Sequence, residues 1–228
     1  MLQINPFLDC TVYSGIGVHI GRNSHERLDN KSIEIIDWGA GQALACMVFF
    51  DFLSSNKLST IIDQVLLIEP SELCIKRGIL HIGKYNFSNN IRTVKKELDS
   101  VSENEVITSQ TSIKIHLFSN ILDIENFSIV KLIKLIENTQ KGTNYFVCAS
   151  PYITDSKAER VDSFKRHFQS NYSSFELLAS KNNSGRLDDK YWNCNNSYNG
   201  NLGIYCSHPE CGCHKKWTRI IRVFKVVI

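Results

Sequence analysis

Residues 37–43, Asp-Trp-Gly-Ala-Gly-Gln-Ala, form the segment of the chain that is richest in chemical information. They directly follow a short apolar run at residues 33–36, which is typical of a buried strand. Two glycines one residue apart, Gly39 and Gly41, let the backbone turn sharply and let a ligand approach it closely. A helix that begins behind such a turn presents its N-terminal amides to a polar or anionic ligand. We therefore predict a ligand-binding turn between the first strand and the first helix.

The acid that follows the turn helps to identify the ligand. A nicotinamide fingerprint needs a small residue where this chain has Leu44, and an acid about 20 residues further on. Neither requirement is met, so a nicotinamide oxidoreductase is the weaker hypothesis. The second apolar run, residues 65–68, instead ends at Glu69. A carboxylate at that strand tip can accept hydrogen bonds from both hydroxyls of a ribose.

The turn and Glu69 together resemble the first motif and the ribose-binding acid of the class I S-adenosylmethionine-dependent methyltransferases. One position departs from the family pattern, since Ala43 stands where a third glycine is usual. The order of an acid, an aromatic residue and then glycines is similar to a branch of ribosome-associated methyltransferase-like proteins. The resemblance implies cofactor contacts from four residues: Asp37, Gly39, Gly41 and Glu69.

Three further segments follow in the order that this family shows. Asp99, after a weaker strand at residues 91–94, is the acid that the resemblance assigns to the adenine amino group. Residues 115–123 look like the fourth strand and the loop that faces the methyl donor, which adds Ser119 to the expected cofactor contacts. Residues 141–147 resemble the glycine-containing turn into the fifth strand.

Methyl transfer from a sulfonium needs proximity and alignment, and it needs no obligatory nucleophile. A base helps only where the acceptor must lose a proton, and His116, Asp123 and Tyr152 lie near predicted strand ends. His116 lies inside an apolar strand, so we interpret it as a core histidine, and we interpret Tyr152 as a pocket wall. Asn120 is a candidate for orienting an acceptor atom, and a loop-capping role fits it equally well. The weak catalytic candidates are Asn120, Asp123 and Tyr152.

A second group of chemically active residues lies in a polar insert at residues 181–216. Its thiols and imidazoles could hold a structural zinc ion that orders the insert. The spacing lacks the paired Cys-x-x-Cys units of strong zinc motifs, so free thiols in a loop are the alternative. The predicted ligands are Cys194, Cys206, Cys211 and Cys213, with His208 or His214 as a substitute.

The elements that must position these residues alternate between short apolar runs and helix-compatible segments from residue 32 onward. Strands are predicted at residues 33–36, 65–68, 91–94, 112–118, 144–149, 175–179 and 217–228, and helices at 42–53, 71–80, 129–136 and 159–168. This order is typical of an α/β, doubly wound sheet with ligands at the carboxyl ends of its strands. With the resemblance, we expect a mostly parallel Rossmann-like methyltransferase sheet with an antiparallel C-terminal strand. Residues 1–31 would be a lead-in segment, and residues 32–228 the methyltransferase-like domain.

Composition limits the class of protein. The chain has 228 residues, of which 43% are hydrophobic and 21% charged, which excludes disorder and collagen-like repeats. Its longest apolar run falls short of the roughly 18 residues that a membrane span needs, and no secretory signal is recognisable. We therefore expect a cytoplasmic protein with reduced thiols and no membrane partner.

The sequence predicts the methyl donor better than the methyl acceptor. RNA is slightly favoured, because basic residues gather near the C-terminus, although a solvated strand face explains them as well. A net charge of only +3 keeps small molecules and proteins as alternatives. A non-catalytic Rossmann-like binding or scaffold protein is the competing hypothesis, and the oligomeric state is left open. The basic residues are Lys215, Lys216, Arg219, Arg222 and Lys225.

Overall fold

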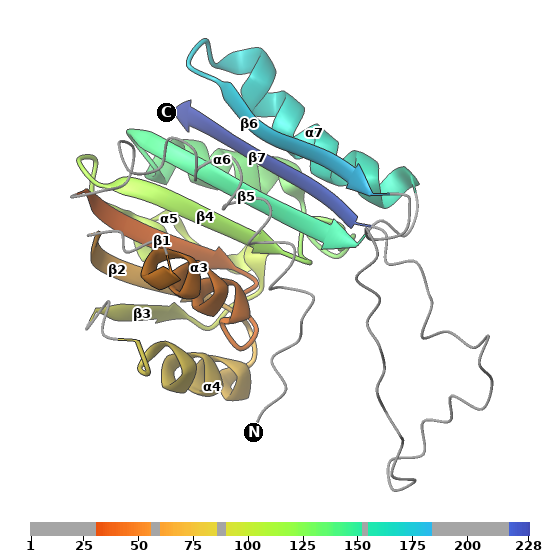
Figure 1. The fold of residues 1–228 in the computed structure, drawn as a ribbon. Coiled ribbons are helices and arrows are strands. Elements are labelled where there is room, and N and C mark those ends of the chain that lie inside the picture. The colour runs from red at the N-terminus through yellow and green to blue at the C-terminus, as the bar shows by residue number, and fades with distance from the viewer. Residues whose placement is uncertain (1–30, 56–59, 86–89, 152–154, 184–218) are drawn as a thin grey trace, which may run out of the picture.

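The fold is one twisted β-sheet with helices on both faces (Figure 1). The computed structural model describes residues 31–55, 60–85, 90–151, 155–183 and 219–228. Its strands are β1 (Ser32–Trp38), β2 (Ile61–Ile68), β3 (Ile91–Val94), β4 (Ile113–Ser119), β5 (Thr143–Pro151), β6 (Glu176–Asn183) and β7 (Arg219–Val227). Its helices are α3 (Leu44–Ser55), α4 (Glu72–Ile82), the 3-10 turn η1 (Leu98–Ser100), α5 (Glu103–Val106), α6 (Ile129–Thr139) and α7 (Asp155–Asn171).

The strand order within the described residues is β3-β2-β1-β4-β5-β7-β6. Strands β1 to β5 pair in parallel, whereas β7 is antiparallel to both of its neighbours, β5 and β6. This confirms the predicted fold class, a doubly wound, mostly parallel Rossmann-like sheet with an antiparallel C-terminal strand. Since β1 pairs with both β2 and β4, the order reverses at β1, and the crevice at its carboxyl end is where such sheets bind ligands.

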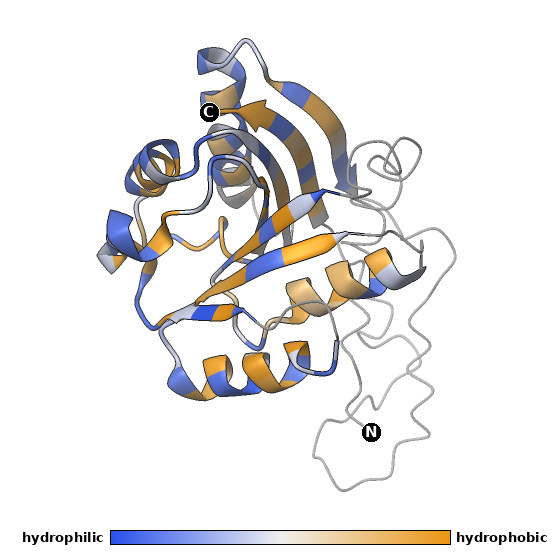
Figure 2. Cartoon of the chain, turned by 90° about the vertical axis from the view of Figure 1, so that its left-hand side faces the viewer, coloured by the Kyte–Doolittle hydropathy of each residue, from blue (hydrophilic) through white to orange (hydrophobic). Residues whose placement is uncertain are grey.

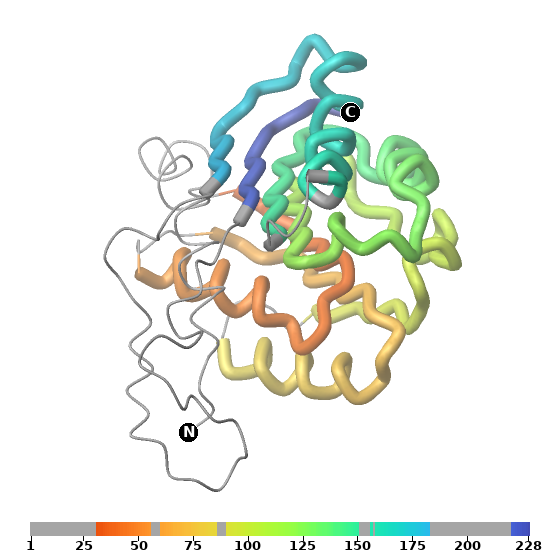
Figure 3. Tube along the Cα trace, turned by 90° about the vertical axis from the view of Figure 1, so that its right-hand side faces the viewer, coloured from red at the N-terminus to blue at the C-terminus, as the bar shows by residue number. Residues whose placement is uncertain are grey.

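Two apolar cores hold the layers together, one on each face of the sheet. Helices α3 and α4 cover one face and α5, α6 and α7 cover the other, as Figure 3 shows from the side. Because both faces of the central strands are covered, their residues are buried almost without alternation, as in β1, where six consecutive residues are buried. On the second face, Phe146 of β5 stacks on Phe224 of β7 with ring centroids 4.8 Å apart.

The helices differ in how much of their surface they bury. Helix α3 is apolar nearly all round and lies against the sheet, whereas α4 alternates between apolar and polar residues and has an exposed outer side (Figure 2). Hydroxyl caps fix where two helices begin, with Ser71 accepting from the amide of Cys74 and Ser128 from that of Lys131. No described helix is long and apolar enough to cross a bilayer.

Several predicted features lie outside the described residues. These are the lead-in segment, most of the insert between β6 and β7, and Tyr152. The predicted domain boundaries therefore stay predictions. The same holds for the positions of the four predicted metal ligands, Cys194, Cys206, Cys211 and Cys213, and of the possible substitutes His208 and His214.

Candidate functional site

The glycine turn leaves β1 through a series of left-handed residues. Gly39, Gly41 and Ala43 have φ angles of 69°, 52° and 60°. Glycine adopts this region freely, whereas an alanine there costs roughly 1–2 kcal/mol. Helix α3 consequently begins at Leu44, two residues after the predicted start, because the turn uses the intervening positions. Ala43, where the sequence resemblance places a third glycine, is therefore a left-handed position in this chain.

The carboxylate of Glu69 joins the glycine turn to the end of β2. Its Oε2 accepts a hydrogen bond from the amide of Gly41, and its Oε1 accepts one from the amide of Ser71, both at 3.0 Å. The amide of Ala40 also donates to the carbonyl of Ile68 at 2.9 Å. The structure thus brings together the two features that the sequence resemblance paired. Each carboxylate oxygen keeps a further lone pair, with which it can accept a hydroxyl hydrogen.

The two glycines of the turn have different surroundings. A Cβ atom on Gly39 would lie 2.7 Å from Cδ1 of Ile121, so a side chain from the loop after β4 fills that approach. A Cβ atom on Gly41 would meet no atom of the described residues within 4 Å. The close approach predicted for a ligand is therefore available at Gly41, beside Glu69, while Gly39 makes room for the protein's own side chain.

Asp37 supports the turn from inside the core. Only 1% of its surface is exposed, and its Oδ2 accepts a hydrogen bond from the thiol of Cys46 at 3.3 Å. Burial raises the pKa of this carboxyl to about 7, and the negative charge of Glu69 acts in the same direction. Burial also raises the pKa of the Cys46 thiol, which therefore stays protonated. Asp37 is thus a supporting residue of the turn, with its side chain withdrawn from solvent.

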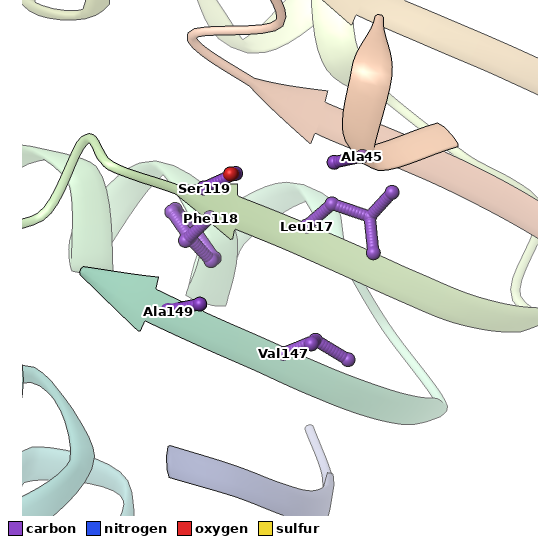
Figure 4. A pocket seen from close by; sticks show the side chains of 6 residues that line it. All are labelled: Ala45, Leu117, Phe118, Ser119, Val147 and Ala149. Carbon is purple, nitrogen blue, oxygen red and sulfur yellow. The ribbon is translucent and has the colours of Figure 1, made fainter. Parts of the chain in front are cut away.

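Ser119 lies at the end of β4, on the rim of a narrow hollow between β4, β5 and the start of α3 (Figure 4). The hollow is too narrow to hold a water molecule. A ligand therefore does not fit into this hollow as it stands, and the open side of Gly41 is the better binding surface. The lining residues are Ala45, Leu117, Phe118, Ser119, Val147 and Ala149.

The loop after β4 brings two of the catalytic candidates to the same end of the sheet. Asn120 is left-handed, with φ of 57°, and its amide donates to the carbonyl of Ala149 at 2.7 Å. This backbone role matches the loop-capping alternative. Asp123 is only 6% exposed, and its Oδ1 has no hydrogen-bond partner among the described residues. A buried oxygen without a partner is costly, so Asp123 is the more informative candidate.

Arg160 of α7 fastens that loop. Its guanidinium donates to the carbonyls of Leu122, Ile124 and Phe127 at 3.2, 2.6 and 3.1 Å, and it also lies over the ring of Phe127. Three carbonyls held by one side chain give the loop a fixed shape. The sequence offered no signal for this contact, because Arg160 lies more than 30 residues away from each carbonyl.

Asp99 contacts the beginning of α6. Its Oδ1 accepts a hydrogen bond from the amide of Ser128 at 3.0 Å, and Nζ of Lys131 lies 3.9 Å from its other oxygen. Both partners belong to the N-terminus of α6, where a carboxylate is favourable. The described contacts of Asp99 therefore link η1 to α6, and its contact with the adenine stays a prediction.

Part of the predicted basic surface is internal. Arg222 is only 4% exposed and forms a two-pronged ion pair with Asp162 of α7, at 2.7 and 2.9 Å. Lys225 lies 3.9 Å from the carboxylate of Glu176. The solvated-face interpretation is therefore wrong for Arg222, and these two cations give little support to an RNA-facing edge.

The described residues contain no group of three or more His, Cys, Asp or Glu side chains that could hold a metal ion. Three described cysteines are free, and of these Cys46 and Cys148 are buried, as expected for small core residues. Zinc thus finds no support in the described part of the chain. His116 is fully buried with hydrogen bonds at both ring nitrogens, which confirms it as a core histidine.

Comparisons with known proteins concern the fold alone. No family model and no curated relative matches the chain. Among solved structures, the RNA methyltransferase candidate PH1948 from Pyrococcus horikoshii is 12% identical, with 90% of this chain and 79% of that chain covered and a TM-score of 0.47. TrmK from M. capricolum with S-adenosylhomocysteine is 11% identical, with 90% of this chain and 66% of that chain covered and a TM-score of 0.43. An rRNA-methylase candidate from Clostridium thermocellum is 12% identical, with 91% of this chain and 94% of that chain covered and a TM-score of 0.49.

Proposed function

We propose that this chain is an S-adenosylmethionine-dependent methyltransferase. The observation that carries the proposal is the Glu69 carboxylate held against the Gly41 amide, at the point where the strand order reverses and where no described residue fills the Cβ side of Gly41. A nucleoside with a free ribose needs two acceptors at a fixed strand tip and a backbone that it can approach closely. Both are present, so the residues fit this cofactor.

Each part of the cofactor would meet a different group. The two oxygens of Glu69 would accept the ribose hydroxyls, since each already accepts only one amide hydrogen. The turn and the first amides of α3 would receive the carboxylate of the amino acid portion, since the N-terminus of a helix favours an anion. The first turn of α3 holds no acidic side chain to oppose it.

The cofactor supplies a methyl group that is already activated as a sulfonium, so the protein's contribution is placement and exclusion of water. The residues around the turn are fixed by backbone bonds and by packing, which suits that task. Asp123 would accept a proton from an acceptor that must lose one, because its buried oxygen has no partner among the described residues. RNA stays the acceptor that the sequence slightly favours, although the buried Arg222 no longer supports this preference.

Calorimetric titration with S-adenosylmethionine, S-adenosylhomocysteine and NADH tests the proposal. We expect micromolar binding of the first two, no binding of NADH, and loss of binding in Glu69→Ala. Glu72→Ala is the matched control, because Glu72 lies three residues away and pairs with Lys76 and Lys95 at the surface. Absence of binding by the wild-type chain would contradict the proposal. Binding with no transfer to RNA, protein or small-molecule acceptors would favour the non-catalytic binding protein.

A further inference from the structure

A chain of buried polar side chains crosses the sheet beneath the glycine turn. The indole Nε1 of Trp38 donates to Nδ1 of His116 at 3.1 Å, and Nε2 of His116 lies 2.9 Å from Oδ1 of Asn144. The amide nitrogen of Asn144 then donates to the carbonyls of Gln140 and Gly142 at 2.8 and 2.7 Å. Trp38, His116 and Asn144 have no exposed surface. The chain therefore connects the end of β1 with the turn that precedes β5.

These hydrogen bonds allow one tautomer of His116. Nδ1 accepts from the indole, so it carries no proton, and the proton is on Nε2 and is donated to Oδ1 of Asn144. Asn144 is fixed in turn, since its nitrogen is committed to two carbonyls. Burial lowers the pKa of His116 to about 3, so the ring stays neutral at physiological pH. Every member of the chain is hydrogen-bonded, and each has one orientation.

The aromatic faces of the same residues are also occupied. The ring of Trp38 is parallel to that of Phe118, with centroids 5.9 Å apart, and the His116 ring stacks on Phe146 at 4.5 Å. Packing holds the planes of the rings, and the hydrogen bonds hold their rotation within those planes. An apolar pair would fill this volume without any hydrogen bond, so the polar pair adds a defined orientation to the packing.

The position of Trp38 makes that orientation relevant to the site. Trp38 lies between Asp37 and Gly39, and the parallel pairing of β1 with β4 ends at Asp37 and Leu117. Beyond that pair, side chains of β4 and its following loop make three contacts with this end of β1: His116 and Phe118 contact Trp38, and Ile121 packs on Gly39. The indole hydrogen bond is the polar and directional one of these three contacts.

We propose that His116 is a positioning residue of the cofactor site: fixed in one tautomer by Asn144, it holds the indole of Trp38 and thereby the glycine turn that binds the cofactor. This inference rests on the proposed function and assigns a role to the aromatic residue of the first motif. His116 acts through Trp38 and contacts no ligand itself.

His116→Phe tests the proposal, because a phenyl ring can stack on Phe146 but can neither accept from Trp38 nor donate to Asn144. We expect the dissociation constant for S-adenosylhomocysteine to rise at least tenfold and the amide of Gly41 to exchange faster with solvent. Phe168→Leu is the matched control, since Phe168 packs in the same core on α7, 4.9 Å from Phe146. It should lower stability while both readouts stay within twofold of wild type.

A double variant separates positioning from stability. Trp38→Phe with His116→Phe removes both partners of the hydrogen bond, so the stability loss should be smaller than the sum of the single losses. If His116 serves stability alone, cofactor affinity recovers along with stability. If it positions the turn, affinity stays at least tenfold weaker than in the wild type.

Two readouts distinguish a failure of this proposal from a failure of the proposed function. If the wild-type chain binds no S-adenosylhomocysteine, the proposed function fails, and exchange of the Gly41 amide still decides the role of His116. Unchanged exchange in His116→Phe overturns the positioning role. Nitrogen NMR of the imidazole at pH 7 should show Nε2 protonated, and a protonated Nδ1 would also overturn it.

Discussion

The Oε2 atom of Glu69 and the amide of Gly41 lie 3.0 Å apart and connect two successive strand-to-helix turns. The same carboxylate accepts from the amide of Ser71, so the turn after β1 and the turn after β2 share one acceptor group. These two hydrogen bonds fix the orientation of the carboxylate. In the proposed function, a carboxylate that is already fixed would lower the ordering cost of binding a ribose.

Glu69→Gln should therefore weaken both the fold and the site. The new NH₂ group cannot accept a hydrogen bond, so one of the two backbone amides loses its partner. Hydrogen bonds to charged groups contribute about 1.5–3 kcal/mol, and we expect a loss of about that size in the free energy of unfolding. Urea denaturation measures it, and Glu72→Gln should change stability by less than about 0.5 kcal/mol. Equal effects of the two substitutions would contradict the shared-acceptor role.

Asp37 and His116 should have opposite effects on the pH dependence of stability. The pKa of Asp37 rises from 3.8 to about 7 on folding, so its contribution to stability falls as pH rises through that range. The pKa of His116 falls from 6.5 to about 3, so its contribution is lost as pH falls through that range. Between about pH 4 and 6.5 the two slopes cancel.

When either residue is replaced, the other should give the free energy of unfolding a pH dependence of up to about 1.4 kcal/mol per pH unit. In Asp37→Asn the remaining effect of His116 makes stability rise between pH 4 and 6.5. In His116→Phe the remaining effect of Asp37 makes stability fall over the same range. Urea denaturation at several pH values compares the variants with the wild type. Parallel pH profiles for all three proteins would show that neither group has the shifted pKa.

Most of the fold could be predicted from the sequence, because the central strands are covered on both faces and so appear as apolar runs. The pairing of the glycine turn with Glu69 could be predicted as well, since neighbouring parallel strands bring their carboxyl ends to one edge. The packing of Ile121 on Gly39 could not, because a glycine pattern records room for a close approach without saying what approaches.

Contacts between distant side chains were equally invisible. Arg222 had an acidic partner 60 residues away, and Trp38 an imidazole 78 residues away. A local pattern of charges or apolar residues does not indicate which side chains of two packed elements meet. The C-terminal cations therefore suggested an exposed surface, although Arg222 lies beneath α7.

Gly78 of α4 and the left-handed Ala43 should be energetically coupled. A Cβ atom on Gly78 would lie 3.1 Å from that of Ala43 and 3.4 Å from Cδ1 of Leu67. In a helix interior, alanine is more stable than glycine by about 1 kcal/mol. The close approach to Ala43 outweighs this gain, so we expect Gly78→Ala to lower the free energy of unfolding by about 1 kcal/mol. In an Ala43→Gly background the facing methyl group is absent.

The same Gly78→Ala change should then raise stability by up to about 1 kcal/mol. Ala43→Gly alone loses a buried methyl group but relieves the left-handed backbone, so it should stay within about 1 kcal/mol of the wild type. A double-mutant cycle by urea denaturation gives the coupling energy, which we expect to favour the double variant by about 1–2 kcal/mol. Additive effects of the two substitutions on stability would show that α4 moves away from Ala43 at no cost in free energy.

Arg160→Met should loosen the loop after β4 while leaving the glycine turn in place. Methionine keeps an unbranched apolar stem but loses the three hydrogen bonds to the carbonyls of Leu122, Ile124 and Phe127. We expect stability to fall by about 2 kcal/mol, and amides of residues 121–128 to exchange faster, with the Gly41 amide unchanged. If Asp123 serves the acceptor, affinity for S-adenosylhomocysteine stays within twofold while turnover falls, because the fixed loop presents the carboxylate.

Arg166→Met is the control, since Arg166 pairs with Glu159 at the surface of the same helix. Equal exchange in both variants would mean that the loop holds its shape without Arg160.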